Sequence, residues 1–493
     1  MYFLLILLNA YFVSFTDKPT KTAPQLSPRA VEQRAKWHIT TDEMDYPVCG
    51  MYIDSLQRIG ATVYHKSRWF NGVTVEMDAT QAAKVAKWSF VRSVEMTRDD
   101  TTPSYAPLKR MKRQQEEAQN DQMVQDLTVN YTDAQLATYN LTPLHNLGYE
   151  GQGILMAVCD GAFYNANTLS CFRQSQELGH FDLTDDSKYG YTFYGPEGTH
   201  GTECLSTISG IMEGYYGAAT QAQYYLMKSE EDDTESPKEM DNMVVALETA
   251  DSLGVNIFSV SLGYTEFDNS TWTLPKTALN GKSTRASLAA TIAARKGMLV
   301  FVAAGNDGTS SWRTICSPAD ADSIITVGAV TTDSVAGNFS SYGPSADGRV
   351  KPEVCAVGVR TTLIYPNGTI VTSNGTSFAT PLMAGFAATL WSALPDENAM
   401  QIRDRIIRSA HLYPNNDSCH QMGYGIPDAW QAYQMDLPTG IEDVRSQNSD
   451  FRSQNSDFRS QNSDVRTQKI LRDGKLYLMY KGQMYDVQGK IVH

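Results

Sequence analysis

The pattern of hydrophobic and polar positions changes several times along this chain, and each pattern predicts a different kind of structure. Beyond about residue 140, short continuous apolar runs alternate with segments of helical spacing. Continuous apolar runs are typical of strands in a parallel sheet, because crossover helices bury both of its faces. The predicted strands are 153–159, 223–227, 255–260, 298–303 and 323–327, and the predicted helices are 240–253 and 287–296. We therefore predict an α/β domain with a three-layer, parallel-sheet arrangement over residues 140–436.

The stretch from 28 to 98 has shorter elements of mixed type. The predicted elements are helices 52–59 and 79–88 and strands 62–65, 72–77 and 90–96. The order α-β-β-α-β predicts a small α+β domain of the ferredoxin-like kind, with two helices on one face of its sheet. Residues 99–139 are polar and include the basic run 109–113, so we interpret them as an exposed linker.

The chain begins with an apolar run over residues 1–15, interrupted only by Asn9 and Ser14. The run is too short to span a bilayer but suits the core of a signal peptide. We therefore predict a signal peptide over residues 1–16 and an exported protein, which is secreted, periplasmic or attached to the cell surface. No Lys or Arg precedes the run, and a buried N-terminal strand or helix is the alternative interpretation. No other stretch predicts a transmembrane span.

The C-terminal part carries a polar repeat. Residues 444–450 recur as 451–457 and 458–464, with one apolar position in each copy, whereas a coiled coil needs two. We interpret 437–468 as a low-complexity linker. Residues 469–493 alternate around the turn signal Lys481-Gly482 and predict a short β tail.

Composition restricts the partners. The net charge is −14, which argues against nucleic acid or an anionic membrane surface as the main partner. Seven cysteines cannot all pair with one another, although removal of the part that carries Cys49 would leave six. Disulfides and free buried thiols are equal alternatives at this point.

Four segments of the α/β domain place polar side chains at strand ends or helix starts. Asp160 and Asn306 follow predicted strands, His200 precedes a helical run, and Ser377 lies just before an apolar helix over 382–394. Ligands of open α/β sheets bind at the carboxyl ends of strands, so Asp160 and Asn306 are expected at one edge. Each segment alone has an ordinary explanation as a turn, a cap or a strand exit. The prediction of a catalytic site depends on all four occurring in one domain.

These residue types suit acyl transfer. A serine hydroxyl is a good nucleophile only when an adjacent base removes its proton during the attack. Histidine suits that role because its ordinary pKa is near neutrality, and a carboxylate can hold it in the required tautomer. An Asn side chain and a helix-start N–H can donate hydrogen bonds to the oxyanion that forms.

The four segments resemble the motifs of the subtilisin-like serine proteases (subtilases, peptidase family S8). They read Asp-Gly at 160–161, His-Gly-Thr at 200–202, Ala-Ala-Gly-Asn at 303–306 and Asn-Gly-Thr-Ser-Phe-Ala-Thr-Pro at 374–381. The resemblance covers roughly residues 145–433. It implies a serine endopeptidase in which Ser377 is the nucleophile, His200 the general base, Asp160 the orienting carboxylate and Asn306 an oxyanion-hole donor. It also implies that Ser261, Leu262 and Gly263 pair with the substrate backbone.

The same resemblance implies further parts of the site. Ala303, Ala304 and Gly305 line the other side of the primary pocket, and Cys316 lies near its base. Gly161 departs from the Ser or Thr that is usual in the family, which removes a local hydrogen bond but keeps the carboxylate. His180 competes with His200 but lacks the Gly-Thr that follows it.

The partners implied are protein or peptide substrates and the chain's own propeptide, since 28–98 resembles the inhibitory propeptides of subtilases. The last residues resemble the sorting tails of Bacteroidetes-type secreted proteins. The chemistry requires no cofactor and no metal ligand is assigned, although the acidic run 230–235 could bind structural calcium or be a solvated loop. A non-catalytic binding module on the same scaffold is one alternative function. An esterase is another, although the Gly-x-Ser-x-Gly context is absent around Ser377.

Overall fold

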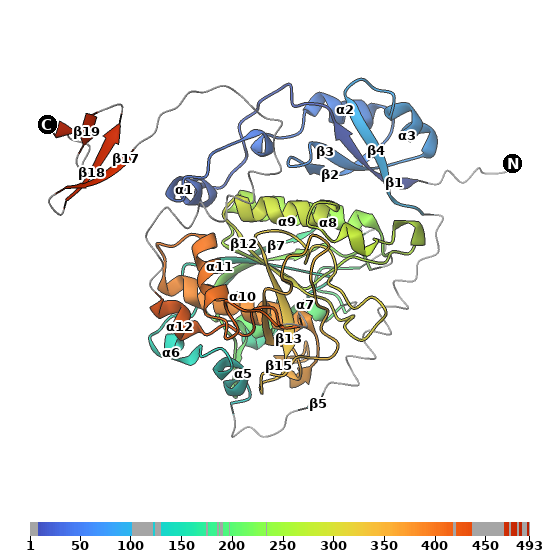
Figure 1. The fold of residues 1–493 in the computed structure, drawn as a ribbon. Helices are drawn as coiled ribbons and strands as arrows, with labels where there is room; N and C mark the ends of the chain where they lie inside the picture. The colour runs from blue at the N-terminus through green and yellow to red at the C-terminus, as the bar shows by residue number, and fades with distance from the viewer. Residues whose placement is uncertain are drawn as a thin grey trace. The chain divides into compact units, whose positions relative to one another are not determined.

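The computed structural model of the protein describes most of the chain in two compact units, 1–435 and 436–493. The described residues are 8–100, 122–123, 130–173, 176–184, 187, 191–196, 198–232, 234–417, 421–435, 468–472, 475–480, 483–485 and 491–492. We call residues 8–100 the N-terminal region and residues 130–435 the main region. The two belong to the same compact unit, and Figure 1 shows their elements.

A seven-stranded sheet forms the centre of the main region. Its strands are β6 (Leu155–Asp160), β7 (Gln176–Asp182), β10 (Gln223–Lys228), β11 (Ile257–Val260), β12 (Leu299–Ala303), β13 (Ile325–Val330) and β14 (Val354–Val357). Their order is β14-β13-β12-β11-β6-β10-β7, and every neighbouring pair is parallel. The predicted parallel sheet is confirmed. Because β6 lies between β11 and β10, the direction of winding reverses there, and ligands of such sheets bind at the carboxyl ends of the strands next to this point.

Helices cover both faces of this sheet. The longer ones are α7 (His200–Ser209), α8 (Pro237–Leu253), α9 (Arg285–Arg295), α10 (Thr376–Ala393), α11 (Ala399–Arg408) and α12 (Ala429–Gln434). Alternate residues of β6 enter two different hydrophobic clusters: Met156 and Val158 pack with α7 and α10, whereas Leu155 and Ala157 pack with α8 and α9. Both faces of β6 are therefore buried, which explains its continuous apolar run and confirms the three-layer arrangement.

Shorter elements complete the main region. They are α5 (Asp133–Ala137), α6 (Thr142–Asn146), η2 (Ser170–Phe172), β8 (Ile211–Met212), β9 (Tyr215–Tyr216), η4 (Ser270–Trp272), η5 (Lys276–Ala278), β15 (Thr361–Ile364) and β16 (Ile370–Ser373). Strand β5 (Gln122–Met123) precedes this region in the chain and pairs with β16. Within the described ranges, no helix combines the length and apolar character that crossing a membrane requires.

The N-terminal region is a four-stranded antiparallel sheet with two helices on one face. Its elements are β1 (Asn9–Phe15), α1 (Pro28–Lys36), η1 (Glu43–Asp45), α2 (Gly50–Arg58), β2 (Thr62–Ser67), β3 (Gly72–Met77), α3 (Ala79–Val85) and β4 (Val91–Arg98). The strand order is β2-β3-β1-β4, so β1 pairs with β3 on one side and β4 on the other. The predicted ferredoxin-like domain is therefore present, but it needs a strand that lies before residue 28.

Strand β1 corrects the assignment of residues 9–15 to a removable signal peptide. These residues are an inner strand of the sheet, which is the alternative that the sequence left open. The apolar run has a structural cause, because both faces of β1 are covered. Tyr11, Val13 and Phe15 pack against α2 and α3, whereas the Phe12 ring on the other face lies 4.5 Å from the guanidinium carbon of Arg285 in α9. Residues 1–7 lie outside the described residues.

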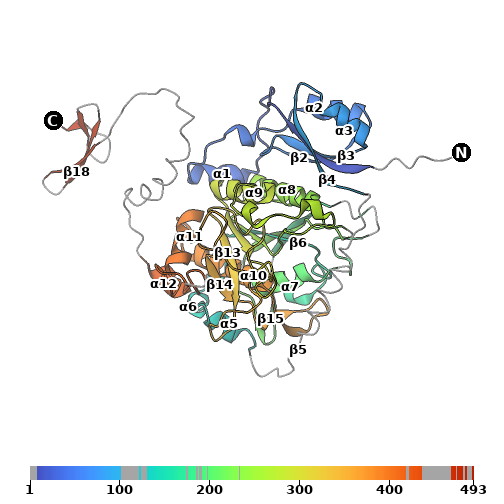
Figure 2. The same ribbon diagram turned by 45° about the vertical axis from the view of Figure 1, so that its right-hand side comes forward.

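The N-terminal sheet contacts the helical layer formed by α8 and α9. Strands β1, β2 and β4 all contact α8, and Figures 1 and 2 show both helices between the two sheets. Thr74 Oγ1 lies 3.2 Å from Asp241 Oδ2 of α8, and Arg285 of α9 forms an ion pair of 2.6 Å with Glu95 of β4. The layer of α8 and α9 thus packs against both the seven-stranded sheet and the N-terminal sheet.

The second unit contains four antiparallel strands, β17 (Gln468–Arg472), β18 (Lys475–Tyr480), β19 (Gln483–Tyr485) and β20 (Ile491–Val492). This agrees with the predicted β tail. The polar repeat between 444 and 464 lies outside the described residues.

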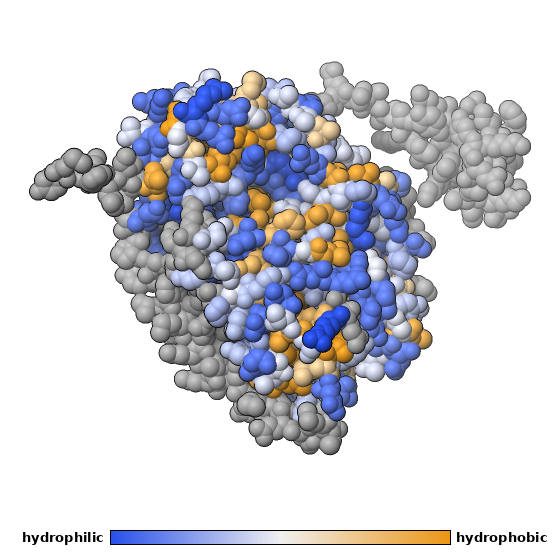
Figure 3. Space-filling model, turned by 180° about the vertical axis from the view of Figure 1, so that it is seen from behind, coloured by the Kyte–Doolittle hydropathy of each residue, from blue (hydrophilic) through white to orange (hydrophobic). Residues whose placement is uncertain are grey.

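On the face of the molecule seen in Figure 3, hydrophobic residues occur in groups interrupted by hydrophilic ones.

Candidate active site

Asp160 and His200 meet at the carboxyl edge of the seven-stranded sheet. Asp160 is the last residue of β6 and is buried, and His200 is the first residue of α7. The Nδ1 atom of His200 lies 2.8 Å from Asp160 Oδ1, which also accepts a hydrogen bond of 2.8 Å from the backbone N–H of Gly161. The carboxylate therefore holds the imidazole through Nδ1, which leaves Nε2 as the atom for proton transfer.

Close backbone packing brings the two segments together. Gly201 donates its N–H to Ala162 O at 3.0 Å, and a side chain at Gly201 would place Cβ 2.4 Å from that same oxygen. A glycine is therefore required directly after His200. Gly161, where the family usually has a hydroxyl, has the expected consequence: Asp160 Oδ2 is buried and accepts no hydrogen bond from the residues that the structure describes.

Ser377 lies at the start of α10, the long helix that packs against the same sheet. Its backbone oxygen accepts hydrogen bonds from Ser261 Oγ at 2.7 Å and from Cys204 Sγ at 3.3 Å, and its Oγ lies 3.4 Å from Ser261 O. Cys204 is one helical turn from His200 on α7. The ring of Phe378, the residue after Ser377, has its centroid 5.6 Å from that of His200. The starts of α7 and α10 therefore meet beside the end of β6.

Asn306 faces the start of α10 from the end of β12. Its Oδ1 accepts hydrogen bonds from the backbone N–H of Thr376 at 3.0 Å and from Thr376 Oγ1 at 2.9 Å. A backbone N–H can only donate, so the oxygen of the amide must point to Thr376 and Nδ2 must point the other way. Asn306 is exposed, and its Nδ2 is therefore a donor that solvent or a ligand can reach.

Two neighbouring strand ends lie side by side and both contact the start of α10. Ser261, Leu262 and Gly263 follow β11, and Ala303, Ala304 and Gly305 end or follow β12, its parallel neighbour. Cys316 contacts both strand ends. A Cβ atom built on Gly263 would lie 2.1 Å from Cys316 Sγ, and one built on Gly305 would lie 3.5 Å from it. Burial raises the pKa of the Cys316 thiol to about 12.

Negatively charged side chains lie near Cys316. Burial, followed by the charge of Glu266, raises the pKa of the Asp307 carboxyl above its ordinary value. In the acidic run 230–235, Asp232 binds Lys228 Nζ at 2.8 Å and Glu231 binds Lys238. These two carboxylates of the run, for which calcium binding and a solvated loop were the alternatives, therefore have lysine partners.

His200 lies beside Asp160 and Phe378, and Asn306 lies beside Thr376, whereas the competing histidine lies elsewhere. His180 is on strand β7, where its Nδ1 lies 3.1 Å from the Tyr194 hydroxyl and 3.4 Å from Glu177. The sequence analysis missed β7, because alternating exposure gives this strand little apolar character. It also missed Cys204 and Thr376, although their positions four residues after His200 and one before Ser377 could have indicated a role beside the site.

One cluster of metal-ligand atoms falls within the site itself. Ligand atoms of Asp160, His200 and Cys204 lie within 4.8 Å of one another. Two of these atoms already form the Asp160–His200 hydrogen bond, and burial raises the pKa of Cys204 to about 11, so this thiol is protonated at neutral pH. A protonated thiol and a histidine already bonded to a carboxylate are poor metal ligands, so the cluster is suited to proton transfer instead. Six cysteines, at 49, 159, 171, 204, 316 and 355, are buried free thiols, and Cys419 lies outside the described residues.

Two family models match the chain. A family model described as "Subtilase family" matches residues 145–425, and one described as "Peptidase S8 propeptide domain, Bacteroidota" matches residues 10–120. The second match includes nearly all of β1, which supports the assignment of this strand to the N-terminal region.

Two subtilisins show the same relationship. Subtilisin DY of Bacillus licheniformis is 30% identical over 269 residues, which cover 53% of this chain and 85% of that protein. Subtilisin NAT of Bacillus subtilis subsp. natto is 29% identical over 283 residues, which cover 55% of this chain and 64% of that protein. Among solved structures, the prenylagaramide maturation protease PagA has a TM-score of 0.48 and 23% identity, covering 60% of this chain and 98% of that one.

Proposed function

Because the chain belongs to the subtilase family of serine endopeptidases, we propose that it cuts peptide bonds with Ser377, His200 and Asp160 as its catalytic residues. The observation that carries this proposal is the hydrogen bond of 2.8 Å between His200 Nδ1 and Asp160 Oδ1 beside the helix start that bears Ser377. This arrangement supplies a nucleophile, a base and an orienting carboxylate at one sheet edge.

The reaction follows from these positions. His200 Nε2 takes the Ser377 hydroxyl proton as Oγ attacks the carbonyl carbon of the substrate, and Asp160 stabilises the imidazolium that forms. The oxyanion receives hydrogen bonds from Asn306 Nδ2 and from the backbone N–H of Ser377 at the helix start. His200 then gives its proton to the leaving amine, and a water molecule releases the acyl group by the same steps in reverse order.

The walls beside the site suit an extended peptide. Ser261 to Gly263 would pair with the substrate backbone, and Ala303 to Gly305 would line the opposite wall of the primary pocket. Cys316 would close the base of this pocket. Extended chains are recognised through backbone hydrogen bonds, with pockets for alternate side chains.

The N-terminal region acts in this proposal as an inhibitory propeptide. Arg98, at the end of β4, forms an ion pair of 3.2 Å with Glu231. Glu231 lies three residues beyond Lys228, which is paired in register with Asp160. The last strand of the N-terminal region therefore ends near the sheet edge that carries Asp160. The protein would be exported as a precursor, and the β tail would be its sorting signal.

A fluorophosphonate probe, which reacts with activated serines, tests the proposal. We expect labelling of the protein and hydrolysis of casein, both abolished in Ser377→Ala. Ser392→Ala, on the same helix, is the matched control and should retain both. Hydrolysis of a p-nitrophenyl ester without hydrolysis of casein would indicate an esterase, and labelling that persists in Ser377→Ala would contradict the assignment of the nucleophile.

A further inference from the structure

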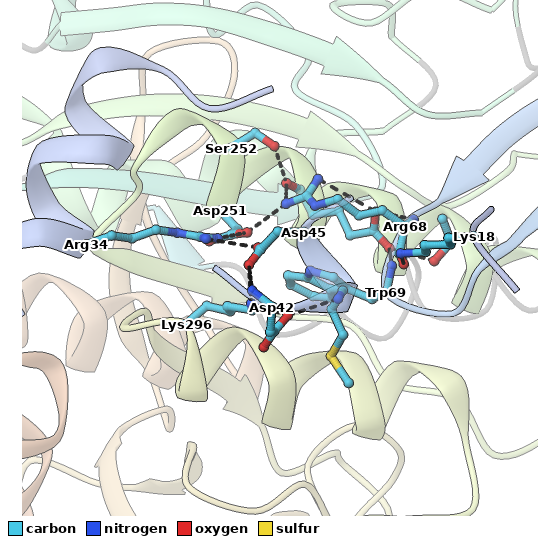
Figure 4. Close-up of polar contacts among 12 residues, drawn as sticks. Lys18, Arg34, Asp42, Asp45, Arg68, Trp69, Asp251, Ser252 and Lys296 are labelled. Atoms are coloured by element: carbon cyan, nitrogen blue, oxygen red, sulfur yellow. Dashed lines mark hydrogen bonds and ion pairs between the residues drawn. The ribbon is translucent and has the colours of Figure 1, made fainter. Parts of the chain in front are cut away.

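A long connection in the N-terminal region leaves its own sheet and contacts the main region. It comprises residues 16–49, between β1 and α2, and contains α1 and η1; we call it the strap. A ferredoxin-like domain needs only one helix between its first two strands, and here that helix is α2, so the strap before it is an addition to the fold. Figure 4 shows its polar contacts with α8 and α9.

The strap contacts the edge of the sheet opposite to the catalytic residues. Arg29 Nη2 donates to Gly153 O at 2.9 Å and to Asn256 Oδ1 at 2.6 Å, just before β6 and β11 begin. Asp160 and Ser261 lie at or just beyond the other ends of these two strands. Strands of this length at about 3.3 Å per residue separate the two edges by on the order of 15–20 Å. A ligand bound at the strap position therefore leaves the cleft accessible.

The strap caps the C-terminal end of α8. Ser27 donates its backbone N–H to Ser252 O at 2.8 Å and its hydroxyl to Leu253 O at 2.9 Å, and Arg29 Nε donates to Gly254 O at 3.1 Å. The last carbonyls of a helix have no partner within the helix and carry partial negative charge, so donors and a cation bind there favourably. A Cβ atom on Gly254 would lie 2.7 Å from Ala30 N, so the close contact depends on this glycine.

A chain of buried ion pairs also attaches the strap to the C-terminal ends of α8 and α9. Arg34 binds Asp251 of α8 through both carboxylate oxygens, at 2.7 and 2.8 Å, and also binds Asp45 of the strap at 2.9 Å. Asp45 in turn binds Lys296, at the end of α9, at 2.7 Å. The side chains of Arg34, Asp45, Asp251 and Lys296 are each at most 6% exposed. Each buried charge has a partner of opposite sign, as desolvated ions require.

We propose that the strand-start edge of the main region is a second binding site, specific for the strap, which holds the propeptide independently of the cleft. This inference rests on the proposed function, since it concerns what happens after the chain cuts itself. Two joined contacts bind more tightly than either alone, because each keeps the other at high local concentration. The strap therefore slows release of the cut propeptide, in addition to the contacts of its sheet with α8 and α9.

The first test uses the full-length chain after self-cleavage. Size-exclusion chromatography should find the N-terminal fragment with the main region, and Arg29→Ala with Arg34→Ala should make the fragment dissociate at least tenfold faster. Arg58→Ala is the matched control, because Arg58 is exposed at the end of α2 and outside the strap. Equal dissociation rates in the double variant and the control would overturn the proposal.

A peptide of residues 16–48, added to the cleaved unaltered protein, tests the site without altering the folded chain. It should speed release of the fragment at least tenfold and leave hydrolysis of a short chromogenic peptide unchanged. The same peptide with Arg29→Ala and Arg34→Ala should do neither. Competitive inhibition of hydrolysis by the unaltered peptide would place it in the cleft and overturn the proposal.

Hydrogen exchange in the Ser377→Ala chain separates this inference from the protease proposal. The uncut variant needs no catalysis, and adding Arg34→Ala should raise exchange of the amides of residues 27–31 at least tenfold while β3 keeps its protection. Unchanged exchange at 27–31 would overturn the strap site. Failure of the unaltered chain to cut itself would instead count against the protease proposal alone.

Discussion

The two edges of the seven-stranded sheet hold polar groups in opposite ways. At the strand-start edge, Arg34, Asp45 and Asp251 each have partners on several sides, and the ions neutralise one another. At the strand-end edge, Asp160 and Asn306 are held from one side: Asp160 through Oδ1, and Asn306 through its oxygen, with Nδ2 facing away. Charged groups paired on several sides fix a structure, whereas groups held on one side are oriented and still able to react. The difference separates an anchoring edge from a catalytic edge.

Asp160→Asn should give the largest change. The amide cannot stabilise the imidazolium and favours the wrong tautomer of His200, so kcat should fall roughly 10⁴-fold. Asp182→Asn, at the end of the nearby strand β7, is the control and should change kcat less than about twofold. Steady-state kinetics on a chromogenic peptide measures both, and similar losses in the two variants would show that the catalytic edge is not centred on β6.

Asn306→Asp should give the next largest effect. The carboxylate keeps an acceptor for the Thr376 N–H but loses the Nδ2 donor, so kcat should fall roughly 10²- to 10³-fold with little change in KM. Asp307→Asn is the neighbouring control. A change confined to KM would instead indicate that Asn306 binds substrate in the ground state.

Asp45→Asn should lower stability in a pH-dependent way. Burial raises the pKa of Asp45, but hydrogen bonds from Lys296 and from the Asp42 backbone, together with the charge of Arg34, more than offset this and hold the pKa below its ordinary value of 3.8. The contribution of Asp45 is therefore complete above about pH 4 and is lost as the pH falls through the lower pKa of the folded state. We expect Asp45→Asn to cost about 1–3 kcal/mol at pH 7.

The measurement is urea unfolding of the Ser377→Ala chain with and without Asp45→Asn, at pH 7, pH 5 and below pH 4. The difference between the two proteins should be equal at the first two values and smaller at the third. A difference that grows in acid would contradict the interpretation that the Asp45 carboxylate is ionised and paired with both Arg34 and Lys296.

The smallest effect concerns Cys204. Burial raises the pKa of this thiol to about 11, so the reactive thiolate is on the order of 10⁻³ of the population at pH 8. Iodoacetamide at pH 8 should leave both Cys204 and the activity unchanged, and mass spectrometry should find Cys204 alkylated only after unfolding. Rapid alkylation with loss of activity would show that the catalytic edge is more open than its contacts indicate.

The sheet and the position of Asp160 at its edge were accessible from the sequence for a simple reason. Strands such as β6 are buried on both faces and so read as unbroken apolar runs, and Asp160 stands directly at the end of one. The same rule misled the analysis at β1. Covered on one face by α2 and α3 and on the other by α9, this strand reads as the apolar core of a signal peptide.

The strap could not be predicted in this way. Its helix α1 is polar, and its attachment depends on pairs such as Arg34 with Asp251, which are 217 residues apart. Charged residues give no sequence pattern that indicates their distant partners. The orientation of the Asn306 amide was equally hidden, because it is decided by a single backbone N–H of Thr376.

The hydrogen bond between the Thr376 N–H and Asn306 has a mechanical consequence. Thr376 precedes Ser377 on α10 and also accepts a hydrogen bond of 3.2 Å from the Gly305 N–H, next to Asn306. A displacement of α10 thus carries the attacking oxygen and the donor for the developing negative charge in the same direction. Thermal motion or distant substitutions should consequently disturb how well peptides are bound before they disturb the bond-breaking step.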